Sequence, residues 1–358
     1  MARCCLQCFD DFVLREQIRS RKDVGDCGFC GAHGVEVLEC RELEGYFEPF
    51  LELYESVPNG TAGTTVPMNQ CLPLWQRLQQ DWKLFSARAG GQERAILADV
   101  FGAGTGHAGY PSSADAYVRN PVLVVGGQTA EAAGMRAAWD ALCRELKEEN
   151  RFFPQKMQDE DKQKRLLACV ARVVPSKSVM WRTRVSNQGR LPPRKMGRPP
   201  AKSARSGRAN PVGIPYLYLA SDKETAVAEV RPSRGVHLTV GRFVTTADLR
   251  LADLTRFSPF QILLADADHF AELVKYFSYL EVVGAELGEP VQDDDAHLDY
   301  LPTQYLCEMI KSLGYEGVAY RSALGSGHNV ALFGMDGIKC TSTTLVKVTS
   351  AVFDFEQT

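Results

Sequence analysis

The chain has 358 residues, enough for two or three domains, and its 45% hydrophobic and 24% charged residues are ordinary values for a globular protein. They exclude a wholly disordered, collagenous or coiled-coil chain. The net charge of −3, from 41 Lys and Arg against 44 Asp and Glu, removes any global electrostatic case for a nucleic-acid or membrane-surface protein. No apolar run reaches the roughly 18 residues of a spanning helix, and the first residues lack the apolar core of a signal peptide. We therefore expect a cytoplasmic protein with no membrane partner.

Cysteines are concentrated at the N-terminus, where five of the eleven lie within the first thirty residues. Cys5 and Cys8 form one C-x2-C pair, Cys27 and Cys30 form a second, and 18 residues separate the two pairs. Two such pairs are typical of a closed tetrathiolate zinc site, which folds a module and leaves no open position for chemistry. We predict structural Zn²⁺ in a Cys-rich module over residues 1–45. Redox-active cysteines and unrelated buried thiols are the alternative interpretations.

The middle of the chain has the pattern of packed helices. In residues 41–57, apolar side chains recur at i, i+3 and i+4, which places them on one helix face. Helices are also predicted in three further segments: 72–85, 93–100 and 129–149. We therefore assign residues 46–150 to a helical domain. A linker is expected at 151–175, because this segment opens with a highly charged stretch that contains a proline.

A basic stretch follows the predicted linker, with ten Lys and Arg residues and no acid between Lys177 and Arg208. A ligand that carries phosphate is its natural partner, and Arg182, Arg184 and Arg208 are the candidates for binding it because they adjoin strand-like residues. The interior of the stretch, rich in Pro and Gly, reads as a loop. Nucleic acid is a less favoured partner, because no aromatic residue that could stack on a base lies between Trp181 and Tyr216.

A strand, a cap and a short helix are predicted next. Residues 216–220 read as the strand, Ser221 or Asp222 as the helix cap, and 223–230 as the helix. Glu229 ends the apolar run of that helix, where an acid needs a partner or a purpose. It could pair with Arg231 or Arg234, or it could serve chemistry. Two more strands are predicted at 236–244 and 248–255 from alternating apolar residues.

The C-terminal half resembles the RES domain family. The resemblance rests on the joint occurrence of GRAN, YLYLA, AEVRP, DLRLADLT and YRS with GHNVALF, and it places a RES domain over residues 176–349. It implies an α+β fold similar to ADP-ribosyltransferases. The Cys-rich module and the helical domain resemble an N-terminal, HEPN-like extension of some longer RES proteins. The predicted architecture is thus a RES domain preceded by a mainly helical domain with a small zinc-binding module.

The resemblance also implies roles for individual residues. The family's arginine falls on Arg182 or Arg184, and its carboxylate and serine fall on Glu229 and Ser322, which are expected to be catalytic together with Arg182. Three further residues are expected to bind the substrate beside Arg184: Arg208, Asn210 and Tyr218.

The expected chemistry fits these residue types. Cleavage of the bond between nicotinamide and ribose in NAD⁺ develops positive charge at the anomeric carbon, which a carboxylate stabilises. Arginine can engage a pyrophosphate with a planar fork, and tyrosine can stack on a ring. NAD⁺ would be the substrate and not a cofactor, and no metal or redox group is needed for this step.

The resemblance implies an enzyme that degrades NAD⁺, a glycohydrolase or phosphorylase, and a bacterial toxin restrained by an antitoxin with a helix-turn-helix. Two alternatives stay open: an ADP-ribosyltransferase that modifies a protein or a nucleic acid, and an inactive sensing protein. The oligomeric state and the acceptor, water or phosphate, are not legible from the side chains.

Overall fold

The structure is a computed structural model that describes residues 2–56, 72–102, 117–119, 123–124, 128–155, 160–289 and 296–350. The chain divides into two compact units. Unit 1 comprises residues 1–135 and 258–278, and unit 2 comprises residues 136–257 and 279–358. Both contain helices and strands, and the large sheet belongs to unit 2, which confirms the predicted α+β class. The domain boundaries proposed from composition stay a prediction.

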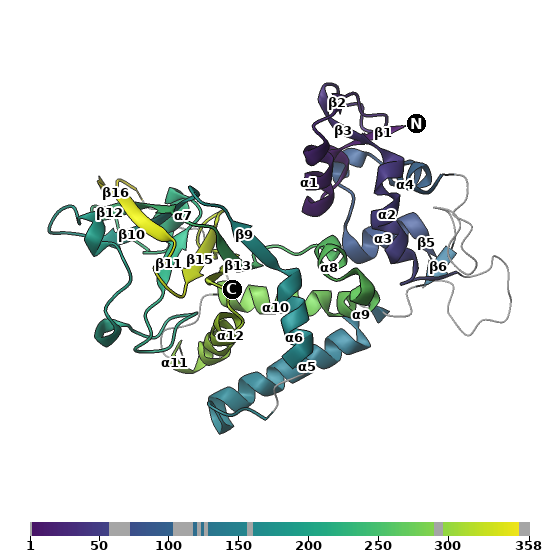
Figure 1. Ribbon diagram of the computed structural model, residues 1–358. Helices are drawn as coiled ribbons and strands as arrows, with labels where there is room; N and C mark the ends of the chain where they lie inside the picture. Colours follow the sequence, from purple (N-terminus) through teal and green to yellow (C-terminus); the bar gives the residue numbers. More distant parts are fainter. Residues whose placement is uncertain are drawn as a thin grey trace. The chain divides into compact units, whose positions relative to one another are not determined.

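Unit 1 is built from short helices and short strands (Figure 1). Its strands are β1 (Arg3–Cys5), β2 (Val24–Gly25), β3 (Val35–Glu39), β4 (Glu55–Ser56), β5 (Leu72–Pro73), β6 (Tyr117–Arg119), β7 (Leu123–Val124) and β8 (Gln128–Thr129). Its helices are α1 (Phe12–Arg21), α2 (Glu44–Leu51), α3 (Leu74–Trp82), α4 (Glu93–Phe101), α8 (Pro259–Ala265) and α9 (Phe270–Leu273). The strand β3 lies between β1 and β2 and pairs with both in antiparallel register.

Local chemistry sets the ends of these helices. At the N-terminus of α1, the Asp11 carboxylate accepts hydrogen bonds from the backbone amides of Val13 and Leu14. Lys22 ends α1 and Lys83 ends α3, both with left-handed backbone angles (φ 60° and φ 51°). The helix predicted at 41–57 is shorter in the structure: α2 ends at Leu51, and β4 begins at residue 55.

Aromatic side chains form the core of unit 1. Phe9, Phe47, Phe50, Phe85 and Phe260 are each almost completely buried. The ring centroids of Phe50 and Phe260 lie 4.9 Å apart, and those of Phe9 and Phe85 lie 5.6 Å apart. Segments far apart in the sequence therefore share one core, to which such aromatic pairs add about 0.5–1.5 kcal/mol each beyond their burial.

Unit 2 contains an eight-stranded sheet with the order β16-β12-β10-β11-β15-β14-β13-β9 (Figure 1). Its strands are β9 (Ala171–Val174), β10 (Val179–Val185), β11 (Leu217–Ala220), β12 (His237–Thr245), β13 (Leu249–Leu254), β14 (Gly317–Arg321), β15 (His328–Leu332) and β16 (Ile338–Lys347). The pair β13 and β14 is parallel, and the other neighbours are antiparallel. The strands predicted at 216–220, 236–244 and 248–255 are confirmed as β11, β12 and β13.

The sheet opens between β10 and β11. These two neighbours pair at one position, Trp181 with Ala220, whereas β10 pairs with β12 over seven positions. Strands that diverge after one pair leave space between them for side chains from both. The candidate site lies at this divergence.

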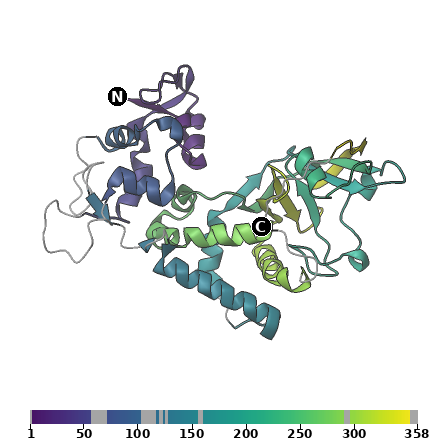
Figure 2. The ribbon, with the colours of Figure 1, turned by 180° about the vertical axis from the view of Figure 1, so that it is seen from behind.

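Four helices lie wholly in unit 2: α6 (Glu160–Cys169), α7 (Lys223–Ala228), α11 (Ala296–Asp299) and α12 (Leu301–Ser312). Most of α5 (Ala130–Arg144) and of α10 (Phe277–Gly288) also belongs to unit 2, although both helices begin in unit 1. Figures 1 and 2 show α5 beside α10 in opposite views. Trp139 of α5 joins them, since its indole Nε1 donates to Glu286 Oε2 at 2.8 Å and its ring meets Tyr279 edge-on. The predicted helix at 129–149 is confirmed as α5, followed by a π-helical turn at Glu145–Glu149. Among the helices of the described ranges, none has both the length and the apolar surface needed to cross a bilayer.

The basic loop after β10 is packed against the sheet. Its Met196 is fully buried in the main core of unit 2, together with Leu217 and Phe243, and Leu191 packs against the same core. Arg190 Nη1 also donates to the carbonyl of Thr343 in β16. The apolar residues of this loop therefore fix its course, while its remaining cations, such as Arg194, are exposed.

Candidate functional site

A cavity of about 360 Å³ lies where β10 and β11 diverge. It combines three kinds of side chain: aromatic rings, two arginines and one carboxylate. Its lining residues come from β10 and β11, from the loop before β11, from α7 and its C-terminal end, from β14 and β15, and from Tyr300 between two later helices. Four of the predicted site residues line it: Arg182, Arg208, Tyr218 and Glu229. The fold thus brings residues as far apart in the sequence as Trp181 and Asn329 into one pocket of the size that binds small molecules.

Glu229 is the C-terminal cap residue of α7 and lines the cavity. Its Oε1 accepts hydrogen bonds from Ser322 Oγ at 2.6 Å and from Asn329 Nδ2 at 2.7 Å. Among the described residues, neither Arg231 nor Arg234 pairs with it, so the ordinary structural explanation of this acid does not hold. Two donors on one oxygen fix the plane of the carboxylate and leave Oε2 without a hydrogen-bond partner in the described part of the chain.

Ser322 is the residue that holds Glu229. Its hydroxyl donates to the carboxylate and accepts hydrogen bonds from the backbone amides of Leu324 and Gly325, both at 3.1 Å. The turn that follows packs on α7 so closely that a Cβ on Gly327 would lie 1.9 Å from Asp222 Oδ2. A glycine is therefore required there. Ser322 itself does not line the cavity.

Arg182 reaches the cavity from β10 as a half-buried cation. Its Nη1 is out of contact with solvent and has no hydrogen-bond partner among the residues that the structure describes. Burial, reinforced by the charge of Arg184, lowers the pKa of Arg182 to about 10, so the guanidinium stays positive at neutral pH. An unpaired buried cation is costly, which indicates that an anion completes it.

Arg184 has a different environment, although it lies only two residues further along β10. Its Nη1 donates to the carbonyl of Lys195 and its Nη2 to the carbonyl of Gly197, at 3.1 and 3.2 Å. These bonds tie the basic loop to the sheet. Of the two candidates for the family arginine, Arg182 is the one in the cavity.

The GRAN segment, residues 207–210, lies in a loop beside the cavity that internal hydrogen bonds hold together. Asn210 Nδ2 donates to three backbone carbonyls, those of Arg205, Pro211 and Ile214. Its Oδ1 accepts a hydrogen bond of 2.7 Å from the Tyr218 hydroxyl, which also accepts from the amide of Ala209. The polar atoms of Asn210 are thus used within the loop, and this network holds the ring of Tyr218 at the cavity wall.

Arg208 is anchored at one end. Its Nη1 donates to the carbonyls of Leu287 and Gly288, the last residues of α10, where a cation also complements the helix dipole. Thr303 Oγ1 of α12 donates to the Arg208 carbonyl at 2.6 Å, which holds the backbone as well. The arginine therefore stands at a fixed position in the cavity wall.

The lining residues that sequence reasoning missed include three aromatic residues and an amide: Trp181, Tyr300, Tyr320 and Asn329. Asn329 lies in β15 and is 5% exposed, between His328 and the buried Val330. An amide inside an otherwise apolar strand needs a partner, and this signal could have been read from the GHNVALF motif. Lys223 Nζ lies 4.9 Å from the ring centroid of Trp181, so that ring also has a cation beside it.

The predicted metal ligands also come together, in unit 1. The sulfur atoms of Cys5, Cys8, Cys27 and Cys30 all lie within 4.8 Å of one another. His33, another potential ligand, is exposed and contacts Asp26 instead.

A protein family and a solved structure resemble part of this chain. A solved structure, a crystal structure of the M. tuberculosis MbcT–MbcA toxin–antitoxin complex, contains a chain that is 17% identical over 53% of this chain and 93% of that chain, with a TM-score of 0.30. No curated protein sequence matches the chain. The family model described as "RES domain" matches residues 179–352. Every residue that lines the cavity falls within this range, so the cavity belongs to the part of the chain that matches the RES domain family.

Proposed function

We propose that the chain is an enzyme that cleaves the bond between nicotinamide and ribose in NAD⁺. The observation that carries the proposal is the cavity in which three features meet: a fixed carboxylate, an arginine whose buried Nη1 has no hydrogen-bond partner among the described residues, and aromatic rings. These groups match a substrate that has a labile glycosidic bond, a pyrophosphate and a flat ring. The resemblance of the sequence to the RES family supplies the identity of that substrate.

Glu229 would stabilise the reacting carbon. As the bond between the anomeric carbon and the nicotinamide nitrogen breaks, its electron pair leaves with nicotinamide and positive charge grows on the ribose. A carboxylate held in one orientation stabilises that charge without having to reorganise during the reaction. Ser322 and Asn329 supply this orientation by hydrogen bonding to Oε1.

Arg182 would bind the pyrophosphate, because its guanidinium is positive and its buried Nη1 has no hydrogen-bond partner in the described part of the chain. Arg208 lines the same cavity and would add a second positive charge. The ring of Tyr218, whose hydroxyl is engaged by Asn210, would contact the nicotinamide through its face. Asn210 and Arg184 would act on binding indirectly, by shaping the loops around the cavity.

The acceptor supplies the bond that replaces the one to nicotinamide. An oxygen of water or of inorganic phosphate forms a bond to the anomeric carbon as nicotinamide leaves, and the acceptor gives up one proton to solvent. Water yields ADP-ribose, and phosphate yields its 1″-phosphate. From the family resemblance we also propose that this activity is that of a toxin which a partner antitoxin restrains.

Nicotinamide release from NAD⁺ tests the proposal. Purified protein is incubated with NAD⁺ in phosphate-free buffer and in buffer with phosphate, and nicotinamide and the ADP-ribose products are separated by chromatography. We expect release in at least one buffer, and the product names the acceptor. Binding of NAD⁺ without release, or release that requires an added protein or nucleic acid that becomes modified, would contradict the proposal.

Replacement of Asn329 by Ala tests whether this residue orients the Glu229 carboxylate. In Asn329→Ala we expect kcat to fall by about 10- to 100-fold with little change in KM, because a hydrogen bond to a charged group contributes about 1.5–3 kcal/mol. Ser322→Ala should act in the same direction, since it removes the other donor to Oε1.

A double-mutant comparison separates orientation from a merely structural effect. If Asn329 acts through Glu229, the Asn329→Ala change costs little more once Glu229→Gln is present. Additive losses in the double variant, or a loss confined to thermal stability, would show that Asn329 does not orient the carboxylate.

A further inference from the structure

We infer that Cys5, Cys8, Cys27 and Cys30 bind one Zn²⁺ ion as a closed tetrathiolate, and that this ion holds the N-terminal part of unit 1 folded. The inference is independent of the proposed function, because it concerns residues of unit 1 and not the cavity of the RES domain.

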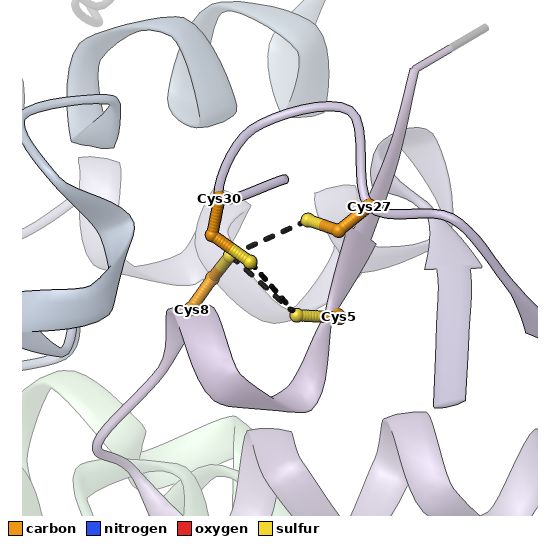
Figure 3. Close-up of side chains that lie close together, drawn as sticks. All are labelled: Cys5, Cys8, Cys27 and Cys30. Carbon is orange, nitrogen blue, oxygen red and sulfur yellow. Dashed lines mark hydrogen bonds between the residues drawn. The ribbon is translucent and has the colours of Figure 1, made fainter. Parts of the chain in front are cut away.

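The geometry of the sulfur atoms is that of ligands around one small cation. Cys5 Sγ lies 3.8 Å from Cys8 Sγ and 3.5 Å from Cys30 Sγ, and Cys8 Sγ lies 3.6 Å from Cys27 Sγ (Figure 3). With Zn–S bonds of about 2.3 Å, the edge of a tetrahedron of sulfurs is about 3.8 Å. A disulfide needs about 2.05 Å, and all four cysteines are free. The separations therefore fit a shared metal and not cross-links.

The burial of the sulfurs favours a metal as well. Cys5 and Cys8 are fully buried, and Cys27 is 6% exposed. Without a metal, four sulfur atoms gathered in one place contribute little to the stability of the fold. A tetrathiolate, in contrast, is a preferred site for Zn²⁺.

The backbone around the sulfur atoms brings the two cysteine pairs together. Cys5 ends β1 and Cys8 ends the following turn, while the second pair lies in the loop between β2 and β3. The amide of Gly28 donates to the Arg3 carbonyl and the amide of Cys27 to the Ala32 carbonyl, both at 2.9 Å. These bonds hold the second pair against the first. Metal ligation would add the strong link that this small module, with its few strands, lacks.

A closed site defines the role of the ion. All four tetrahedral positions are taken by protein sulfur, so no position is open to water or substrate, and the binding free energy becomes folding free energy. We therefore expect loss of the metal to unfold the module around β1 to β3.

The neighbouring Cys4 provides a matched control. It is fully buried and adjoins Cys5, but its Sγ contacts the Leu38 carbonyl at 3.9 Å and it is not part of the four-sulfur cluster. A Cys4→Ser change therefore perturbs the same region without removing a ligand.

Metal content tests the inference. The full chain, purified without chelator, is analysed for zinc and iron by mass spectrometry, together with Cys27→Ser and Cys4→Ser. We expect one zinc per chain in the wild type and in Cys4→Ser, and a large loss in Cys27→Ser. Replacement of the metal by Co²⁺ should give the visible absorption of a tetrahedral thiolate site.

Thiol titration covers the case in which Cys27→Ser does not fold. Addition of an organomercurial to the wild type should release its zinc as four thiols react, with a parallel loss of module structure in the circular dichroism spectrum. Iron in place of zinc, zinc that stays at full content in a folded Cys27→Ser variant, or no binding of Zn²⁺ or Co²⁺ to the reduced protein would overturn the inference. None of these outcomes depends on NAD⁺ cleavage, so the two proposals fail separately.

Discussion

Replacement of Glu229 by Gln is expected to lower kcat for nicotinamide release by about a thousandfold, the upper range for loss of one preorganised electrostatic group. The amide keeps an oxygen that can accept from Ser322 and Asn329, so the hydrogen bonds that fix the side chain persist. What is lost is the negative charge beside the ribose at the moment when positive charge develops there. The measurement is the initial rate of nicotinamide release at saturating NAD⁺.

The controls separate chemistry from binding and stability. Glu224→Gln makes the same change on the exposed side of α7, five residues before Glu229, and should leave the rate unaltered. The affinity of Glu229→Gln for NAD⁺ and its melting temperature should stay near those of the wild type. A Glu229→Gln variant with more than a tenth of the wild-type rate would contradict the role of the carboxylate.

The sequence was sufficient where a residue type has few structural alternatives. The two C-x2-C pairs predicted a four-sulfur cluster, and the four sulfurs do meet. The acid at the end of an apolar helix needed a partner or a purpose, and the resemblance to the RES family assigned it a role. The structure places Glu229 in the cavity wall, and its catalytic role stays a prediction. The alternating apolar residues of β11, β12 and β13 predicted strands that the structure confirms, because the two-residue period of a strand is visible in one segment alone.

The sequence was insufficient where a role depends on contacts between distant segments. Arg182 and Arg184 are alike in the W-R-T-R motif, and only the course of the basic loop decides that one binds backbone carbonyls while the other stays unpaired among the described residues. Asn210 and Ser322 were expected to contact the substrate, yet their polar atoms are engaged by Tyr218 and by Glu229. Whether either also meets the substrate stays a prediction. Asn329, 100 residues after Glu229, becomes its partner only through the pairing of β11 with β15.

The packing of the basic stretch against the sheet could not be predicted from its composition. Pro and Gly indicated a loop, which is confirmed, but its order depends on Met196 and Leu191 packing into the core of the sheet. Two apolar residues in a segment dominated by cations are a weak signal, because the surface against which they pack is formed by strands that come later in the chain.

Replacement of Arg182 by Gln is expected to lower kcat/KM for NAD⁺ by about 100-fold, because a charge-assisted hydrogen bond between guanidinium and phosphate contributes about 1.5–3 kcal/mol. Arg182→Lys should recover little of this loss, since an ammonium cannot form the planar fork. In the absence of ligand, Arg182→Gln should be at least as stable as the wild type, because it removes a half-buried cation whose Nη1 has no hydrogen-bond partner in the described part of the chain. Kinetics with NAD⁺ and thermal melting measure the two effects.

Arg184→Gln is the matched variant two residues away on the same strand. Because Arg184 holds the carbonyls of Lys195 and Gly197, its loss should lower the melting temperature and should reduce kcat/KM less than the loss of Arg182 does. ADP-ribose, which retains the pyrophosphate but lacks nicotinamide, should raise the melting temperature of the wild type and of Arg184→Gln but not that of Arg182→Gln. Equal stabilisation of all three proteins by ADP-ribose would place the pyrophosphate elsewhere. The opposite assignment of the two arginines would follow if Arg184→Gln alone lost the stabilisation.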